Sequence, residues 1–276
     1  MPWHARLQLD YRLESRRSVA RFEHEGPLRV LQSLYPEGDA ICHNVLVHPP
    51  GGLVSGDTLD IQVSASGQSH GLITTPGATR FYKSSGAAAV QTTRIQLQDQ
   101  ARLEWLPQEA LCYDSCDARN HLRLELAPQA ECLAWDISAF GLPQAGLPFE
   151  RGSLHQRIEV PGVWLEQGRL AASDSRLMDG PLGLAGQRCL ASIFFVSGGK
   201  IDRSRRQQAL DVARSVLDAD ALRATAGATS PNEQVVLVRV LGPLVEPVMQ
   251  LLQSVWSAWR AELWGLPATR PRIWAM

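Results

Sequence analysis

Three segments of the sequence share one pattern, and this repeat restricts the possible folds more than any other feature. The segments are 59–77, 95–109 and 124–138. Each contains a strand of alternating polar and apolar residues, a short polar turn with a glutamine, and a second, more apolar strand. The glutamines Gln68, Gln100 and Gln129 are 32 and 29 residues apart. Periods in this range are typical of stacked supersecondary units. The repeat therefore favours a β-helix-like body of stacked sheets over its alternative, a chance resemblance among β-hairpins.

The last third of the chain has a different pattern. Apolar residues recur at helical spacing over 202–224 and again over 244–263, with a short β-rich run at 234–241 between them. We therefore predict a mainly β fold with about two α-helices in the C-terminal third. No linker-like stretch separates the two parts, so we expect a single domain over 1–276, with a β body over about 1–200 and a helix-containing part over about 201–276.

Charge and cysteine content exclude several classes of protein. The 27 basic and 28 acidic residues nearly cancel, which argues against nucleic-acid binding through net charge. Five cysteines are too few and too odd in number for a disulfide framework in 276 residues. The sequence also contains no signal peptide and no apolar run long enough to cross a bilayer. We expect a soluble cytoplasmic protein with reduced thiols.

Motifs that carry enzymatic chemistry are missing from the sequence. It contains no Walker-type phosphate loop, dinucleotide-binding glycine motif, nucleophile elbow or HExxH zinc site. We therefore predict that the protein is not an enzyme.

Metal-ligating residue types gather in one short segment. Cys112 and Cys116 stand among Asp114, Asp117 and His121, and such ligands together suit zinc or nickel. In an extended strand the two thiols would be about 13 Å apart, so only a turn would bring them together. The alternative is that both are thiols with no ligand role.

Carboxylates also accompany the apolar strands. Asp57, Glu104, Glu109 and Asp136 flank or interrupt these strands, and Glu104 and Asp136 occupy nearly the same place in successive repeat units. Buried carboxylates are costly unless they are paired or solvated. They therefore lie either on the solvent face of each strand or in a polar, watered interior.

Several long strings make the chain resemble the UreD family of urease accessory proteins, called UreH in some organisms. These strings are GPLRV with YPEG (26–38), HPPGGLVSGDTLDI (48–61), TTPGATRFYKS (74–84), LEWLPQE (103–109) and RPRIWAM (270–276). In one place the sequence departs from the family, because Leu142 and Leu147 stand where the family usually has Arg and Glu. That difference puts in doubt any polar contact that this stretch makes in relatives.

The resemblance implies a maturation scaffold with a β-helix-like fold. Such a protein binds apo-urease, recruits the UreF–UreG complex and assists nickel insertion, with no tightly bound cofactor and only transient nickel. An internal passage for nickel has been proposed for the family. We expect Asp57, Glu104 and Asp136 to serve that passage, with Glu104 and Asp136 in a column about 4.8 Å apart per layer. Cys112 and Cys116 are the other metal candidates.

The second C-terminal helix is the candidate docking element for UreF. It carries Val255, Trp256 and Trp259, with Trp264 and Trp274 close behind, and tryptophan is enriched in interface hot spots. The alternative is that all five side chains lie in the protein's own core. If this helix is the docking element, truncation from Glu262 onward should leave the rest of the protein folded.

Two other functions stay open at this point. One is a carbohydrate-active enzyme on a β-helix scaffold, with Glu104, Glu109 and Asp136 as acids beside Trp105 and Trp135. The other is a purely structural adaptor that never contacts metal.

Overall fold

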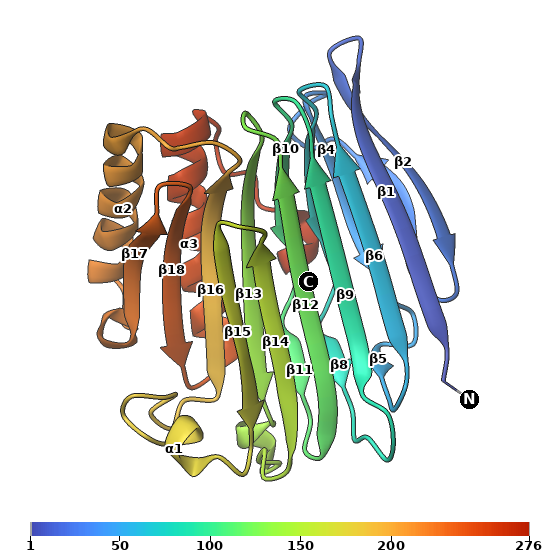
Figure 1. Cartoon of the computed structure of the whole chain (residues 1–276), viewed down its shortest axis with the longest axis vertical. Helices are drawn as coiled ribbons and strands as arrows, with labels where there is room; N and C mark the ends of the chain where they lie inside the picture. The colour runs from blue at the N-terminus through green and yellow to red at the C-terminus, as the bar shows by residue number, and fades with distance from the viewer. Residues whose placement is uncertain (1, 276) are drawn as a thin grey trace.

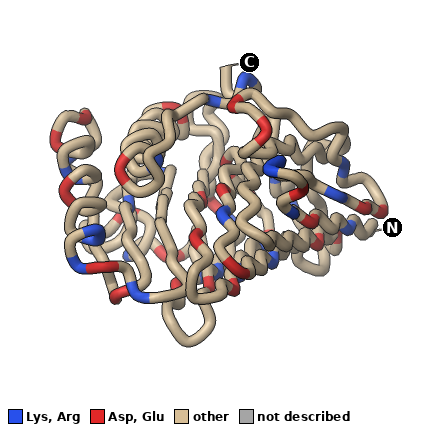
Figure 2. The backbone as a smooth tube through the Cα atoms, turned by 90° about the horizontal axis from the view of Figure 1, so that it is seen from above, with Lys and Arg blue, Asp and Glu red and all other residues tan. Residues whose placement is uncertain are grey.

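Two β-sheets stack face to face, and two long helices cover the free face of one of them (Figures 1 and 2). The computed structural model describes residues 2–275, so Met1 and Met276, the ends of the predicted domain, lie outside the described residues. Sheet A has seven strands, in the spatial order β15 (Trp164–Ala171), β14 (Gly152–Val160), β12 (Cys116–Leu126), β9 (Ala89–Leu97), β6 (Thr58–Ala65), β1 (His4–Glu14) and β2 (Arg17–Glu25).

Sheet B has eleven strands. Its main path is β17 (Ala226–Asn232), β18 (Val235–Gly242), β16 (Cys189–Ser197), β13 (Glu131–Phe140), β10 (Arg102–Leu106), β7 (His70–Thr74), β4 (Ile41–Val47) and β3 (Arg29–Leu34). Three short strands lie off this path: β5 (Gly52–Leu53), β8 (Thr79–Phe81) and β11 (Ala110–Cys112). The helices are α1 (Ser175–Met178), α2 (Arg203–Asp218) and α3 (Val245–Trp264), with 3₁₀ turns at Pro143–Ala145, Arg223–Thr225 and Arg272–Ala275.

The repeat found in the sequence sets the stacking of the strands. In sheet A, Thr58 of β6 is paired in parallel with Val90 of β9, 32 residues later, and Ala89 with Ala118 of β12, 29 residues later. Sheet B has the same two offsets, because His70, Arg102 and Glu131 are aligned across β7, β10 and β13. The predicted stack is confirmed. The two strands of a unit are not a hairpin, however, because they belong to different sheets.

Each unit changes sheet at an equivalent tight turn. The N–H groups of Ser69, Ala101 and Ala130 donate to the carbonyl oxygens three residues earlier at 3.1, 3.1 and 2.9 Å. The three glutamines lie inside these turns, which is why their spacing reports the repeat.

Burial explains why the second strand of each unit is the more apolar one. Sheet A is covered on one face only, so β12 alternates between buried and partly exposed residues. Sheet B is covered by sheet A on one face and by α2 and α3 on the other, so nine of the ten residues of β13 are buried. Such two-sided cover favours continuous apolar strands.

The predicted fold class, mainly β with helices in the C-terminal part, is confirmed. No helix in the described part of the chain is both long and apolar enough to span a lipid bilayer.

Candidate functional site

A row of amide side chains interrupts the apolar layer between the two sheets. Gln91, Asn120 and Gln156 are aligned across β9, β12 and β14, and all three are buried on the inner face of sheet A. We call these three residues the amide row. An inward position of an alternating strand is normally apolar, so three polar side chains aligned at such positions depart from the usual pattern and need an explanation.

The amide row ends at Asp136 of β13, a buried carboxylate on the facing sheet. Asn120 Nδ2 donates to Asp136 Oδ2 at 2.9 Å, and Gln156 Nε2 donates to Oδ1. Ser138 Oγ donates to Oδ1 at 3.4 Å, and Gln91 Nε2 donates to Asn120 Oδ1 at 3.4 Å. The carboxylate is therefore bonded only to neutral groups.

This environment shifts the titration of the carboxyl group. Burial raises the pKa of Asp136 to about 7, and the negative charge of Glu166 adds to the rise, whereas the hydrogen bonds oppose it. Asp136 therefore exchanges its proton near neutral pH. An arriving cation would favour the ionised form and displace the proton.

Two adjoining cavities lead to this carboxylate. A small one of about 20 Å³ is lined by Asp136 and Asn120, and it is large enough for about one water molecule. A larger one of about 220 Å³ extends to residues 75–80, which lead into β8. The two cavities share the lining residues Thr79, Gln91, Trp105 and Pro107. They therefore adjoin each other, and the smaller one reaches Asp136 in the space between the sheets.

His48 lines the larger cavity and contributes a nitrogen atom to its wall. Its Nε2 is buried and has no hydrogen-bond partner among residues 2–275. Burial lowers the pKa of His48, with Asp57 opposing the change, so the imidazole is neutral at pH 7. A neutral imidazole can bind a borderline divalent cation.

The cysteine pair lies next to the same layer. A turn between β11 and β12 brings Cys112 and Cys116, both buried, into thiol–thiol hydrogen-bond contact. This contact and burial raise the pKa of Cys112 well above its ordinary value, and the charge of Asp136 adds to the rise. The Cys112 thiol is therefore neutral and a poor metal ligand. Within residues 2–275 no three His, Cys, Asp or Glu side chains are arranged to hold a metal ion.

Glu104 lies on the opposite face of sheet B, and the predicted column of carboxylates is wrong. The register aligns Glu104 with Leu133, three residues before Asp136. Because side chains alternate along a strand, an odd offset places the two acids on opposite faces. Glu104 faces α3, where its Oε2 accepts from Trp256 Nε1 at 2.6 Å and its Oε1 accepts from His70 Nε2 at 2.8 Å.

Glu104 belongs to a buried charged cluster that holds α3 on sheet B. Arg260 of α3 is fully buried, with its Nε 3.5 Å from Glu104 Oε1 and its terminal nitrogens 2.8 and 3.2 Å from the carboxylate of Glu37. His43 Nε2 also bonds to Glu37 at 2.8 Å. Burial would raise the pKa of Glu37, but the hydrogen bonds from His43 and Arg260 hold it below its usual value.

Asp57 is a turn residue. Its carboxylate accepts from the backbone N–H groups of Trp3 at 3.1 Å and Val54 at 2.9 Å. These bonds fix the entry into β6, so both oxygens are already occupied. Asp57 was expected to serve the nickel passage, but it lines neither of the two cavities that adjoin Asp136.

The five residues of the candidate docking element belong to the protein's own core. Val255, Trp256 and Trp259 are fully buried, Trp264 is 9% exposed, and Trp274 packs against the same cluster. Each indole N–H has an internal acceptor: Glu104 for Trp256, the Ala209 carbonyl for Trp259, Glu131 for Trp264 and Thr74 for Trp274. In this arrangement none of them forms an exposed anchor, because their apolar surface is already covered by sheet B and α2.

The acids suggested for a carbohydrate-active enzyme do not form an open groove. Glu104 and Asp136 are buried on opposite faces of sheet B, and Trp105 and Trp135 are buried with them. Such an enzyme needs paired carboxylates beside exposed aromatic side chains.

The two leucines that depart from the family pattern belong to one small loop. Leu142 N donates to Leu147 O at 2.7 Å, and Leu147 N donates to Leu142 O at 3.2 Å. Leu147 is 56% exposed, and Leu142 lines a cavity of about 410 Å³. The backbone pair therefore closes the loop, and an Arg–Glu contact is not needed to close it.

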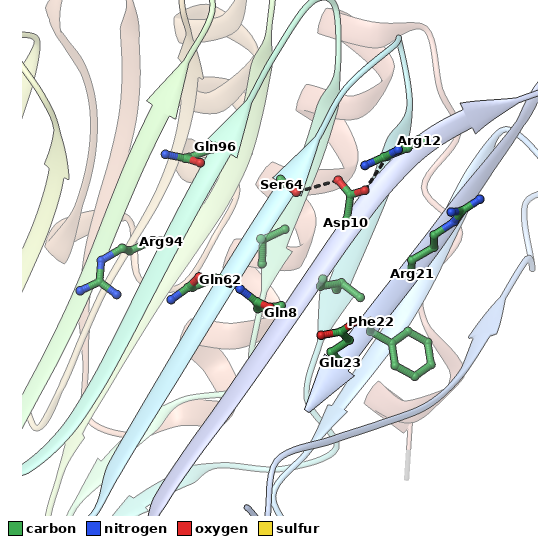
Figure 3. A pocket seen from close by; sticks show the side chains of 12 residues that line it. Gln8, Asp10, Arg12, Arg21, Phe22, Glu23, Gln62, Ser64, Arg94 and Gln96 are labelled. Atoms are coloured by element: carbon green, nitrogen blue, oxygen red, sulfur yellow. Dashed lines mark hydrogen bonds and ion pairs between the residues drawn. The ribbon is translucent and has the colours of Figure 1, made fainter. Parts of the chain in front are cut away.

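The outer face of sheet A carries a broad polar depression of about 730 Å³ over β1, β2, β6 and β9 (Figure 3). Asp10 accepts there from Arg12 at 2.6 Å and from Ser64 at 2.7 Å, and Gln8 bonds to Gln62 at 3.3 Å. These polar groups satisfy one another, so we assign no ligand to this depression.

The amide row and the partners of Glu104 were not predicted from the sequence. The amide row is visible in the sequence, because Gln91, Asn120 and Gln156 stand at inward positions of alternating strands, where apolar residues are expected. The contact between Glu37 and Arg260 joins residues 223 positions apart and has no local signal.

Comparison with known proteins agrees with the resemblance seen in the sequence. The family model described as "UreD urease accessory protein" matches residues 4–275. Proteins named "Urease accessory protein UreD" from Polaromonas naphthalenivorans and Paracidovorax citrulli are 64% and 65% identical over 276 residues, covering all of both chains. The protein of that name from Leptothrix cholodnii is 50% identical, covering 99% of both chains. The chain therefore belongs to the UreD family of urease accessory proteins.

Proposed function

We propose that this protein is a cytoplasmic maturation scaffold that helps nickel enter apo-urease. In this role it binds apo-urease, bridges it to the UreF–UreG complex and gives nickel a polar route between its two sheets. Family membership supports the connection to urease. The five free cysteines are consistent with a reducing compartment.

The observation that carries the proposal is the amide row ending at Asp136. Amide and carboxylate oxygens, one imidazole nitrogen and a place for a water molecule follow one another in an otherwise apolar layer. Scattered oxygen donors hold nickel weakly, so an ion can be passed on instead of being trapped.

Asp136 is suited to a transient contact because its pKa is close to neutral. When nickel arrives the carboxyl group loses its proton, and when nickel leaves it regains it. The neutral thiol of Cys112 does not compete for the ion as a thiolate would.

The test is nickel loading in a urease operon that lacks its own UreD. Replacement by the Asp136→Asn variant should lower the nickel content of purified urease several-fold, while the variant still binds UreF–UreG. His48→Gln should lower nickel loading as well. The control is Asp60→Asn, which removes a carboxylate from the outer face of sheet A.

Normal nickel loading by both Asp136→Asn and His48→Gln would reject the route between the sheets. It would instead favour the structural adaptor that never contacts metal.

A further inference from the structure

Five basic side chains form a compact array on the outer face of sheet A. Arg119 and His121 of β12 are aligned with His155 and Arg157 of β14, and His155 is aligned with Arg169 of β15. We call these five residues the basic array. Arg119 and Arg169 are exposed, and the other three are half-buried.

Most of the basic array lacks a counter-charge. Arg119, His121 and His155 form no ion pair or side-chain hydrogen bond with any residue in 2–275. Arg169 has only a 3.4 Å bond to the hydroxyl of Ser153, and Arg157 is the one member paired with an acid, Glu159, at 3.1 Å.

Other arginines on the outer face of β9 and β12 are paired with acids. Arg94 is paired with Asp60 at 2.8 Å, and Arg123 is paired with Glu125 at 2.7 Å and with Glu159 at 3.2 Å. Across the protein the charges nearly cancel, with a net charge of -1. The guanidinium groups of Arg119 and Arg169 are, in contrast, unpaired positive charges, and they make the basic array a candidate for electrostatic recognition.

The side chains of the basic array also act on one another. Burial lowers the pKa of His121, and the charges of Arg119, Arg157 and His155 lower it further. An anion placed over the array would offset the charges of Arg119 and Arg157 and would favour protonation of His121.

The geometry fits carboxylates on a protein surface. The array covers three strands about 4.8 Å apart, with alternate residues about 7 Å apart along each strand. Acidic side chains three or four residues apart on a helix are about 5–6 Å apart, so one acidic helix face can meet several of these groups. Asp117 and Glu159 lie at the two ends of the array on β12 and β14. A phosphate backbone that continued beyond the basic array would meet these two acids and be repelled by them. This argues against nucleic acid as the partner.

We propose that the basic array is the docking surface for a carboxylate-bearing surface of the urease apoprotein. This inference rests on the proposed function, which makes urease the partner. It adds the face of the molecule that meets urease and the chemistry of the contact.

The test combines Arg119→Glu with Arg169→Glu. Both side chains are exposed and neither is paired with an acid, so the fold should be unaffected. The matched control combines Arg203→Glu with Arg223→Glu, two exposed arginines near α2 that change the net charge by the same amount. Affinity for apo-urease and, separately, for UreF–UreG is measured at low and at high salt.

We expect the array variant to bind apo-urease about tenfold more weakly at low salt, with the difference shrinking at high salt because surface charges are screened. The control should bind apo-urease as the unchanged protein does. Unchanged binding of the array variant to apo-urease would overturn the inference, and so would a loss confined to UreF–UreG.

A second probe separates this inference from the proposed function. If the unchanged protein fails to bind apo-urease at all, the proposed function is wrong and the array is no urease surface. Binding of short poly-L-glutamate then shows whether the array recognises carboxylates. The unchanged protein should bind this peptide, and the array variant should not. Equal retention by both proteins, or preferential binding of duplex DNA, would overturn the carboxylate chemistry.

Discussion

Two buried carboxylates in sheet B are stabilised in different ways. Asp136 is surrounded by neutral donors, and burial raises its pKa to about 7. Glu104 instead lies beside the guanidinium of Arg260 and accepts from the indole of Trp256 and the imidazole of His70. The first arrangement suits a group that exchanges a proton or a cation, whereas the second suits a fixed structural charge.

Removal of the Glu104 charge should destabilise the fold. Glu104→Leu leaves Arg260 without one of its two carboxylate partners and leaves the N–H of Trp256 unbonded, so we expect a loss of about 3–5 kcal/mol in the free energy of unfolding. Urea denaturation measures this loss, with Glu23→Leu on the exposed strand β2 as the control. A Glu104→Leu variant as stable as its control would show that the buried charged cluster contributes little.

Asp136 should make stability depend on pH in the opposite sense to a carboxylate whose pKa is lowered in the folded state. Its pKa of about 7 in the folded state exceeds the ordinary 3.8, so between these values the folded state holds a proton that the unfolded state has lost. The free energy of unfolding therefore falls as pH rises from about 4 to about 7, by up to about 4 kcal/mol. The comparison is with Asp136→Asn, which does not titrate. A constant stability difference between the two proteins over this window would contradict the shift.

At the scale of the element, α3 is held by directional contacts as well as by apolar burial. Its Arg260 reaches Glu37, its Trp256 reaches Glu104, and its Trp264 donates to Glu131 at 2.7 Å. The acceptors of the two indoles lie on sheet B, and Glu37 precedes β4. The helix is therefore part of the body, which accounts for its aromatic density without an external partner.

Truncation after Ala261 should unfold or strongly destabilise the protein, as the alternative that places these side chains in the protein's own core requires. It removes the buried side chains of Leu263 and Trp264 and the partly buried Trp274. Loss of one large buried side chain costs about 3–5 kcal/mol, which is comparable to the total stability of many domains. Thermal unfolding followed by near-ultraviolet circular dichroism measures the effect, with the exposed Glu262→Ala as the control. A truncated chain with the melting temperature of that control would refute this role.

At the scale of the whole molecule, strands distant in sequence are paired side by side. The parallel pairs join residues 32 and 29 positions apart, and α3 packs on strands from several parts of the chain. Every layer shares a face with another, because sheet B is in contact with sheet A on one side and with the helices on the other (Figure 2). Loss of one layer exposes the apolar face of the next.

We therefore expect the sheets and helices to unfold together and to refold slowly. Folds dominated by such non-local pairing fold in about milliseconds to seconds. Far-ultraviolet circular dichroism follows the sheets, and the fluorescence of the tryptophans on and after α3 follows the helical layer. The two transitions should coincide in urea. A fluorescence change that precedes the loss of strand signal would show that the helical layer separates first.

The repeat and the register of the parallel strands could be read from the sequence. The positions of Gln68, Gln100 and Gln129 predict the 32- and 29-residue offsets, because strands stacked in parallel with equivalent corners must keep the spacing of those corners. The structure explains the two strand types, because sheet A is buried on one face and sheet B on both, and burial selects these patterns. The amide row is also visible in the sequence, as polar residues at inward positions of alternating strands.

The packing of the layers, in contrast, could not be read from the sequence. Glu104 follows Gln100 by four residues and Asp136 follows Gln129 by seven, so the register puts the two acids on opposite faces of sheet B, but only the folded protein shows which face meets sheet A and which meets the helices. An apolar helical stripe has the same sequence whether it covers a sheet or binds a partner, so Trp256 and Trp259 could not be assigned from their spacing. Arg260 and Glu37 meet across 223 residues, and a contact at that distance is set by the packing of layers and not by any local pattern.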